Sequence, residues 1–208
     1  MRGRFITMEG LDGAGKTTQL DAAAAHLKSR GLPLHVTREP GGTELGEALR
    51  ALLLDARQRY AAETETLLVF AARREHIEKV IEPALGAGTW VLCARFTDAS
   101  YAYQGGGSGV DWDKLAALER WVQGDLQPDL TLYFDVDPDV GRSRTGKVRA
   151  PDRFEQERED FHARVRAAYL RRAQEHPARI RVIDANAGVA EVAERVRAIL
   201  DGFCEALS

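Results

Sequence analysis

Short apolar runs and longer amphipathic segments alternate along the whole chain. The apolar runs are typical of buried strands, and they lie at residues 5–8, 34–37, 90–94, 130–134 and 179–183. The segments whose apolar residues recur at helical spacing lie at residues 17–30, 44–54, 64–85, 138–144, 154–174 and 189–206. Because parallel strands are joined by crossover connections, usually helices, this order predicts an α/β fold in which helices flank a five-stranded parallel sheet.

Length and composition are those of an ordinary globular protein. A chain of 208 residues that is 44% hydrophobic and 29% charged has room for one substantial core, so we expect residues 1–208 to form a single domain. The net charge of −3 argues against a surface for nucleic acid. No apolar run is long enough to span a membrane, and Glu9 stands where a signal peptide would be apolar. Cys93 and Cys204 lack C-x-x-C spacing and are expected to be reduced, so we predict a soluble, cytoplasmic protein without membrane partners.

Residues 10–17 match the phosphate-binding pattern G-x-x-x-x-G-K-[ST]. The motif follows a predicted strand and opens a predicted helix, an arrangement in which backbone N–H groups and the helix N-terminus surround phosphate oxygens. Lys16 is expected to reach the β and γ phosphates of a nucleotide, and Thr17 to place its hydroxyl on Mg²⁺. The motif alone does not separate a GTPase, an ATPase and a kinase. The N-K-x-D tetrapeptide of common GTPases is missing, because the one asparagine, Asn186, is followed by Ala187.

Polar residues also follow the second and third predicted strands, at the edge of the sheet where open α/β folds bind ligands. Residues 38–42 form a charged pair in a Pro-Gly-Gly turn, which suits either a second anion site or a solvated turn. Arg95 emerges directly from a buried strand, which is unfavourable unless its charge meets an anion. Ser100, Tyr103 and Gln104 supply neutral donors and acceptors for a base edge and a sugar, although such residues also serve as caps and surface contacts.

Two further segments suit a nucleotide. Phe70 and Arg73 share one face of the predicted helix 64–85, which fits a base and a phosphate, or else a core ring beside a surface arginine. Residues 142–158 carry six basic side chains, namely Arg142, Arg144, Lys147, Arg149, Arg153 and Arg158. This segment predicts a lid, at about residues 142–153, that closes over a triphosphate and excludes water. A solvated loop leading into a charged helix is the alternative.

In chain order, the phosphate loop, Arg-Glu-Pro-Gly-Gly, Phe-Ala-Ala-Arg-Arg-Glu-His and Tyr-Gln-Gly-Gly-Gly resemble the motifs of bacterial thymidylate kinases over nearly the whole chain. The resemblance implies a three-layer fold of the P-loop NTPase type. It also implies transfer of the ATP γ-phosphate to dTMP with Mg²⁺, which gives ADP and dTDP for dTTP biosynthesis. Members of the family are usually homodimers, so the resemblance implies a homodimer here.

The resemblance also assigns roles to residues. Those expected to hold ATP are Gly10, Leu11, Asp12, Gly13, Ala14, Gly15, Lys16, Thr17 and Thr18. Those expected to hold dTMP are Glu39, Pro40, Arg50, Phe70, Arg73, Arg95, Ser100, Tyr103 and Gln104. Phe70 would pack on thymine, Ser100 and Gln104 would recognise the base, and Tyr103 would lie against the sugar.

The family has two branches, which differ in whether an additional catalytic arginine lies in the phosphate loop or in the lid. Gly13 stands where one branch has that arginine in the phosphate loop, so the chain resembles the branch that has it in the lid. Arg149 or Arg153 would then supply charge to the transferring phosphoryl group. The resemblance adds Lys16, Arg95 and Asp12 to the catalytic set.

Three positions depart from the family's pattern. The third strand usually ends Asp-Arg, whereas Ala94 precedes the arginine here, and Ser108 replaces a usual Gly or Arg after the glycine run. Val69 stands where many relatives have their stacking Phe. Because alanine cannot organise Mg²⁺ and its water, we expect ATP and dTMP to bind but kcat to be reduced, unless Asp12 or Asp135 compensates. A kinase for another pyrimidine monophosphate and a non-catalytic nucleotide-binding protein are the alternative interpretations.

Overall fold

The computed structural model describes residues 2–145 and 152–207. Five strands, all parallel, form one sheet in the order β2-β3-β1-β4-β5. Their bounds are β1 Phe5–Gly10, β2 Leu34–Arg38, β3 Trp90–Ala94, β4 Leu130–Asp135 and β5 Ile180–Asp184. The sheet predicted from the apolar runs is therefore confirmed, and each strand lies within two residues of its predicted bounds.

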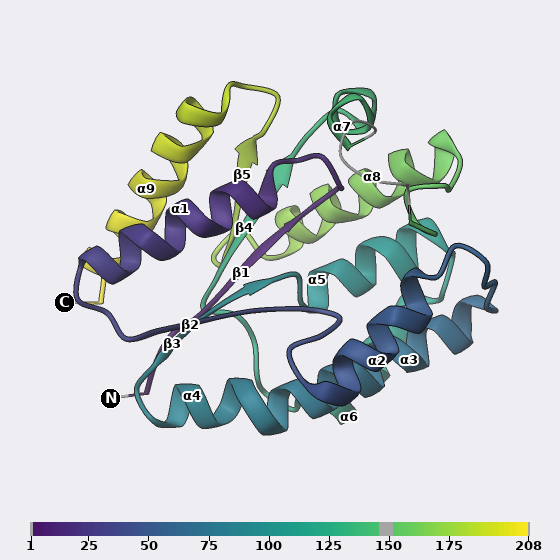
Figure 1. Cartoon of the computed structure of the whole chain (residues 1–208), viewed down its shortest axis with the longest axis horizontal. Coiled ribbons are helices and arrows are strands. Elements are labelled where there is room, and N and C mark those ends of the chain that lie inside the picture. The colour runs from purple at the N-terminus through teal and green to yellow at the C-terminus, as the bar shows by residue number, and fades with distance from the viewer. Residues whose placement is uncertain (1, 146–151, 208) are drawn as a thin grey trace.

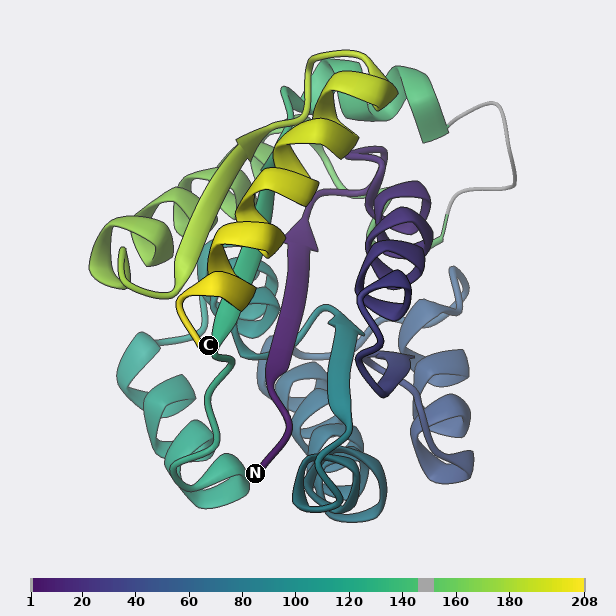
Figure 2. The same ribbon diagram turned by 90° about the vertical axis from the view of Figure 1, so that its left-hand side faces the viewer.

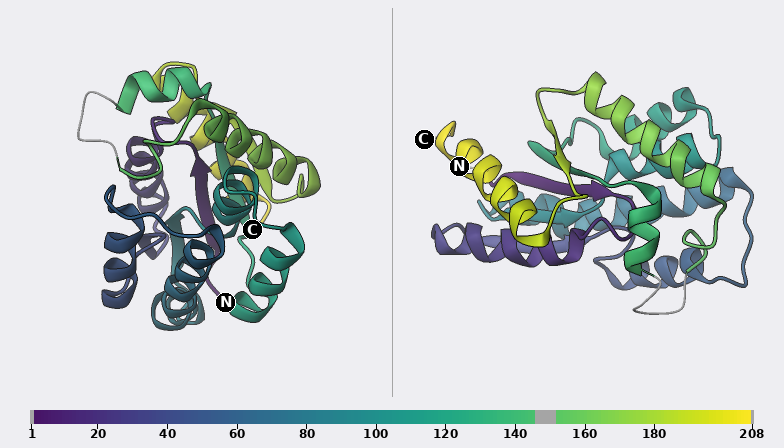
Figure 3. Two further views of the ribbon diagram at one scale, coloured as in Figure 1. Left: turned by 90° about the vertical axis from the view of Figure 1, so that its right-hand side faces the viewer. Right: turned by 90° about the horizontal axis from the view of Figure 1, so that it is seen from above.

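Helices cover both faces of the sheet and make three layers (Figures 1 and 3). Along the chain they are α1 Lys16–Ser29, α2 Glu44–Leu54, α3 Ala62–His76, η1 Ile77–Ile81, α4 Glu82–Gly86, α5 Thr97–Ser100, η2 Tyr101–Gly107, α6 Trp112–Gln123, α7 Pro138–Thr145, α8 Glu159–Glu175 and α9 Val189–Glu205. The η segments are π-helical and continue the helices before them. Helices α1 and α9 pack on one face, and α3 to α6 with α8 pack on the other.

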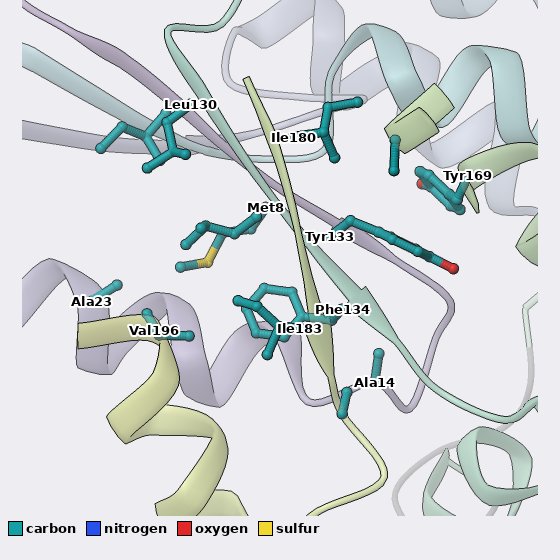
Figure 4. Packing of buried hydrophobic residues seen from close by; sticks show 14 of the residues in the cluster. Met8, Ala14, Ala23, Leu130, Tyr133, Phe134, Tyr169, Ile180, Ile183 and Val196 are labelled. Atoms are coloured by element: carbon teal, nitrogen blue, oxygen red, sulfur yellow. The ribbon is translucent and has the colours of Figure 1, made fainter. Parts of the chain in front are cut away.

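The three central strands, β3, β1 and β4, are largely buried because helices lie on both faces of the sheet, whereas the edge strands β2 and β5 are partly exposed. All six residues of β1 are buried, which explains its nearly continuous apolar run. On the face of α1 and α9, Met8 packs with Phe134, Ile183 and Val196 (Figure 4). Successive strand residues point to opposite faces, so the side chains that follow each strand also divide between the two faces.

Two helix predictions need correction. The predicted helix 154–174 begins only at Glu159, because Asp152 Oδ1 accepts hydrogen bonds from the backbone N–H groups of Phe154 (3.0 Å) and Glu155 (3.1 Å) and so closes a local turn. Helix α6 lies outside all the predicted segments, and so does the helical stretch formed by α5 and η2. Helix α6 has a recognisable start, since the side chain of Asp111 caps it by accepting from the N–H of Asp113 at 2.7 Å.

The carboxyl ends of β1, β2 and β3 meet at one edge of the sheet. Figure 2 shows β1 running up the centre of the molecule into the loop before α1, with β3 beside it. The strand order changes direction at β1, and such a switch point is where open α/β sheets bind ligands. None of the helices in the described part of the chain is both long and apolar enough to cross a lipid bilayer.

Candidate active site

The loop between β1 and α1 has a backbone that excludes side chains at one position. Gly13 has a left-handed φ of 79°, and a Cβ added there would lie 2.0 Å from the carbonyl oxygen of Gly141 on α7. The glycine at residue 13 therefore has a structural reason, because the phosphate loop packs directly against the backbone of α7 there.

Lys16 folds back onto this loop. Its Nζ donates to the carbonyl oxygens of Gly10 at 2.9 Å and Leu11 at 2.7 Å, and lies 3.6 Å from Oδ1 of Asp12. Burial, with a further contribution from the neighbouring Arg95 charge, lowers the pKa of Lys16 to about 8. The ammonium group is thus held among carbonyl oxygens at the point where a phosphate loop binds phosphate.

The pKa of Lys16 leads to a prediction about pH. The ATP affinity of the protein is expected to fall about tenfold between pH 7 and pH 9, because a lysine with a pKa of about 8 must regain its proton to bind the triphosphate. Calorimetric titration with ATP at both pH values measures this. Lys16→Arg is the matched control, since a guanidinium stays charged over this range. An unchanged affinity of the unmodified protein between the two pH values would contradict the prediction.

Arg95 joins the phosphate loop to the rest of the site. Its Nη1 donates to the carbonyl of Gly10 at 2.6 Å, its Nη2 to Oδ1 of Asp12 at 2.7 Å, and its guanidinium lies over the ring of Tyr103. Among the described residues it is the one non-glycine with a positive φ, 71°. A bulky residue in the left-handed region is strained by roughly 1–2 kcal/mol, and such strain concentrates at functional sites.

A buried acid, Glu9, holds the backbone that follows Arg95. Glu9 at the end of β1 accepts hydrogen bonds from the N–H of Phe96 at 2.7 Å and from the hydroxyl of Tyr169 at 2.9 Å. Burial raises the pKa of Glu9 to about 7. The sequence analysis did not single out Glu9 for the site, and the signal for it was an acid in an otherwise apolar strand.

A cleft that is open to solvent lies beside the phosphate loop. Nine of the predicted site residues line it, namely Asp12, Glu39, Pro40, Arg50, Arg73, Arg95, Ser100, Tyr103 and Gln104. The rest of the lining consists of Val69, which stands where many relatives have their stacking Phe, and of six residues without a predicted role, namely Leu53, Leu54, Phe96, Ala99, Asp152 and Phe154. The structure therefore brings the second, third and fourth motifs together at one cavity.

The cleft has a charged part and an apolar part. Arg95 and Asp12 join it to the phosphate loop, and Arg50, whose Nη1 donates to the carbonyl of Pro40 at 3.0 Å, adds positive charge. Val69 and Phe96 supply apolar walls. This lining fits a molecule that carries both an anionic group and a flat ring.

Phe70 is placed elsewhere. It is 2% exposed and belongs to the core cluster beneath α3, with the Arg73 guanidinium 4.9 Å from its ring centroid. Val69, one position earlier on the helix, lines the cleft instead. The side chain from this turn of α3 that faces the cleft is therefore aliphatic.

Arg73 and Glu39 form a buried ion pair in the cleft wall. Arg73 Nε donates to Glu39 Oε2 at 2.7 Å, and its Nη2 donates to the carbonyl of Phe96 at 3.0 Å. His76 Nδ1 lies 3.1 Å from the other Glu39 oxygen, and its Nε2 lies 2.7 Å from Oγ1 of Thr37. Because each buried charge has a partner, the network is rigid and fixes where Arg73 stands. His76 was a missed contributor, although it lies one helical turn after Arg73.

Two hydroxyl groups in the cleft wall are poised for a ligand. Ser100 Oγ and Tyr103 Oη are buried and have no hydrogen-bond partner among the described residues. A buried polar group without a partner is unfavourable by about 1–3 kcal/mol. Binding of a polar molecule in the cleft would satisfy both groups, which agrees with their predicted role.

The predicted lid is only partly described. Residues 146–151, with Arg149 and Lys147, lie outside the described residues. Arg153 is described and is 5% exposed: its Nη2 pairs with Glu65 and its Nε donates to the carbonyl of Leu53 at 3.0 Å. Arg142 pairs with Glu159 at the surface.

The donor set for a magnesium ion is small. Within the ranges 2–145 and 152–207, no group of three or more His, Cys, Asp or Glu side chains is placed to hold a metal. Thr17, exposed at the start of α1, and Asp12 are the oxygen donors that the phosphate loop offers. Mg²⁺ commonly takes one or two protein oxygens together with substrate phosphates and waters, so these residues fit an ion that arrives with a nucleotide.

A phosphate loop at the switch point of a parallel sheet, with a second anionic-ligand cleft joined to it by an arginine, defines the class of P-loop nucleotide-binding proteins that act on a second small phosphate ester. The family model described as thymidylate kinase matches residues 8–196. The chain therefore belongs to the thymidylate kinase family, and it is a kinase.

Individual relatives agree with this assignment. The chain is 62% identical to the thymidylate kinase of Nitrosospira multiformis over 94% of this chain and 96% of the relative. It is 58% identical to the thymidylate kinase of Nitrosomonas europaea over 100% of this chain and 96% of that one. The crystal structure of thymidylate kinase from Ehrlichia chaffeensis superposes with a TM-score of 0.77 at 36% identity, covering 96% of this chain and 99% of the other. These matches confirm the P-loop fold and do not favour a non-catalytic protein.

Proposed function

We propose that the enzyme transfers the γ-phosphate of ATP to dTMP and gives ADP and dTDP. The observation that carries this proposal is the link made by Arg95, which contacts the phosphate loop through Gly10 and Asp12 and also lines the second cleft. Donor and acceptor phosphates would therefore meet at one guanidinium. The expected ATP site is the loop from Gly10 to Thr18, and the expected dTMP site is the cleft.

The chemistry needs positioning and charge. An oxygen of the dTMP phosphate attacks the γ-phosphorus, and the bond between that phosphorus and the bridging oxygen of ADP breaks, so no covalent enzyme intermediate forms. Lys16 and Arg95 spread the charge of the transferring group. Mg²⁺, held with the nucleotide by Thr17 and Asp12, would neutralise further phosphate charge when bound.

Roles in the acceptor site follow the two parts of the cleft. We assign the phosphate end to Arg50, Arg73 and Arg95, with Glu39 and Pro40 shaping that wall. Ser100 and Gln104 are assigned to the base, and Tyr103 to the sugar. Phe70, from its buried place, would support Arg73 rather than touch the base.

The lid supplies the last part of the proposal. We assign residues 142–153 as the lid of one kinase domain spanning residues 1–208, with Arg149 or Arg153 contributing charge at the transferring phosphoryl group. For Arg153 this role requires its contacts with Glu65 and Leu53 to open when ATP binds.

A single-substrate panel tests the proposed reaction. ADP release is measured with ATP and Mg²⁺ in the presence of dTMP, dUMP, UMP, CMP or dCMP, each at several concentrations. The proposal requires the highest kcat/KM with dTMP and the appearance of dTDP. A higher kcat/KM with any other monophosphate would reassign the acceptor, and no turnover with all five, despite binding measured by calorimetry, would remove the proposal.

We propose a cytoplasmic homodimer. Two neighbouring helices carry exposed large hydrophobic residues, Leu67 on α3 (55% exposed) and Trp121 on α6 (80% exposed), which suit a helical contact with a second copy. Light scattering on the unmodified protein is expected to give twice the chain mass, and Trp121→Glu is expected to shift the population towards monomer. A monomeric unmodified protein at micromolar concentration would contradict the dimer.

A further inference from the structure

Three buried polar side chains form a chain of contacts behind the cleft. Gln104 on η2 donates from Nε2 to Glu65 Oε1 at 2.8 Å, and Arg153 pairs through Nη2 with the other oxygen, Oε2. The exposed fractions of Gln104, Glu65 and Arg153 are 3%, 2% and 5%. Three separate parts of the chain therefore meet at the Glu65 carboxylate, and the motifs singled out in the sequence do not include Glu65.

The guanidinium of Arg153 makes two further contacts in this structure. Its Nε donates to the carbonyl of Leu53 at 3.0 Å, and it lies over the ring of Phe154, 4.3 Å from the centroid. With both carboxylate oxygens engaged, Glu65 is a paired charge in a buried environment. Removal of one partner from such a pair is strongly unfavourable, so the carboxylate stays where it is.

The Glu65 carboxylate decides how the Gln104 amide is turned. An ionised carboxylate only accepts hydrogen bonds, whereas a glutamine amide has a donating nitrogen and an accepting oxygen. The nitrogen of Gln104 must therefore face Glu65. The oxygen, Oε1, is then the amide atom that Gln104 keeps for the cleft it lines.

This part of the cleft is the one that suits a base. Val69, which lines it, lies four residues after Glu65 on α3 and thus on the same helical face, and Phe154 follows Arg153. The acceptor phosphate is assigned to Arg95, beside the phosphate loop. Gln104 therefore presents an acceptor oxygen to a base edge.

We propose that Glu65 is a positioning residue that determines which pyrimidine the enzyme accepts. Thymine and uracil carry an N3–H that donates to Gln104 Oε1, whereas the N3 of cytosine is an acceptor and would face an acceptor. Glu65 acts through Gln104 and does not touch the substrate. The inference rests on the proposed assignment of the cleft to a nucleoside monophosphate, and it adds the residue that sets the direction of the hydrogen bond.

Glu65→Gln tests the inference. A glutamine at residue 65 would turn its oxygen to Arg153, which only donates, and its nitrogen to Gln104. The Gln104 amide would then have to turn round and present its nitrogen to the cleft. The ratio of kcat/KM for dTMP to kcat/KM for dCMP is expected to fall about tenfold or more. The reason is that cytosine N3, an acceptor, would no longer face the acceptor oxygen of Gln104. Glu65→Asp keeps an acceptor-only carboxylate and is expected to retain the ratio within about threefold of the unmodified enzyme.

A purely structural role for the buried pair predicts a different result. Arg153→Lys weakens the same pair without changing what Glu65 accepts, and it is expected to lower kcat/KM for both substrates by the same factor. If Glu65→Gln also lowers both equally and leaves the ratio unchanged, the inference is overturned. If Glu65→Gln fails to fold, a loss of discrimination in Glu65→Asp overturns it as well. If the unmodified enzyme does not prefer dTMP, the proposed function fails first, and that outcome is seen before any variant is made.

Discussion

Replacement of Arg95 by asparagine is expected to lower kcat/KM for dTMP phosphorylation about a thousandfold or more while the protein stays folded. Arg95 is the side chain that touches the phosphate loop and also lines the acceptor cleft. Asparagine is too short to reach from the end of β3 to the carbonyl of Gly10 or to two phosphate groups. It also removes the positive charge that the transferring phosphoryl group requires.

Asparagine is chosen because of the backbone. Arg95 has a φ of 71°, and asparagine is among the non-glycine residues that adopt the left-handed region most readily. The relief of strain offsets part of the loss of the hydrogen bonds to Gly10 and Asp12, so the free energy of unfolding is expected to change by no more than about 2 kcal/mol. Urea unfolding and steady-state kinetics on the same preparation separate the two effects.

Arg95→Lys is the matched control. Lysine keeps one positive charge but lacks the planar fork that contacts Gly10 and Asp12 together, so an intermediate loss of kcat/KM is expected. A loss of less than tenfold in Arg95→Asn would show that phosphoryl transfer does not depend on this guanidinium. The same conclusion would follow if both variants kept the kcat of the unmodified enzyme and lost kcat/KM equally through a higher KM for dTMP.

The fold was largely predictable because its signals are local. Each strand buried on both faces needs a continuous apolar run, and the glycine pattern of residues 10–17 fixes a loop whose backbone must approach phosphate closely. The parallel sheet then brings the residues after β2 and β3 to the same edge as the loop. Pro40, Arg95 and Gln104 were therefore predicted to share a site although they are far apart in sequence, and they line one cleft.

The rest depended on tertiary contacts that carry no local signal. On α3, residues 69 and 70 are both apolar, and only the angle of the helix over the sheet decides that Val69 faces the cleft and Phe70 the core. Glu65 looked like any acid in the first turn of a helix, and its burial is set by Arg153, 88 residues away. The helical pattern of residues 154–158 was overridden by the hydrogen bonds that the Asp152 side chain accepts.

The directions of the side chains around Ala94 show which acid could replace the carboxylate that is missing at residue 94. Leu92 belongs to the cluster on the α1 side of the sheet, so Ala94, two residues later on β3, points to that same side, where the phosphate loop lies. Asp135 shares a face of β4 with Tyr133, which stacks on Tyr169 of α8, so it points to the opposite side. Arg166 also occupies both of its oxygens, at 2.7 and 2.9 Å.

Asp12 is the acid that the phosphate loop itself contributes on this side, and Glu155 lines the same small cavity as Asp12. Asp12 Oδ1 is already shared by Arg95 at 2.7 Å and Lys16 at 3.6 Å. A carboxylate that balances two cations has less charge to offer to a metal and its waters. The alanine at residue 94 therefore leaves this side of the site short of one negative charge.

Ala94→Asp is accordingly expected to raise kcat by about 10- to 100-fold, the range by which carboxylates that orient a metal and its ligands usually act. The new carboxylate would extend from the end of β3 towards the loop that holds Lys16 and Thr17. The Mg²⁺ concentration that gives half the maximal rate is expected to fall, while the KM for dTMP changes little. Initial rates of dTDP formation, over a range of Mg²⁺ concentrations and separately over a range of dTMP concentrations, measure kcat, the Mg²⁺ dependence and the KM for dTMP.

Ala94→Asn separates charge from size, because asparagine has nearly the same shape as aspartate but no charge. It is expected to leave kcat and the Mg²⁺ dependence near those of the unmodified enzyme. If Ala94→Asp leaves kcat unchanged, the enzyme is not impaired by the alanine, and Asp12 must supply the missing charge despite its contacts with Arg95 and Lys16. In that case Asp12→Asn in the Ala94→Asp background is expected to retain activity that Asp12→Asn alone loses, which ties the compensation to a single carboxylate.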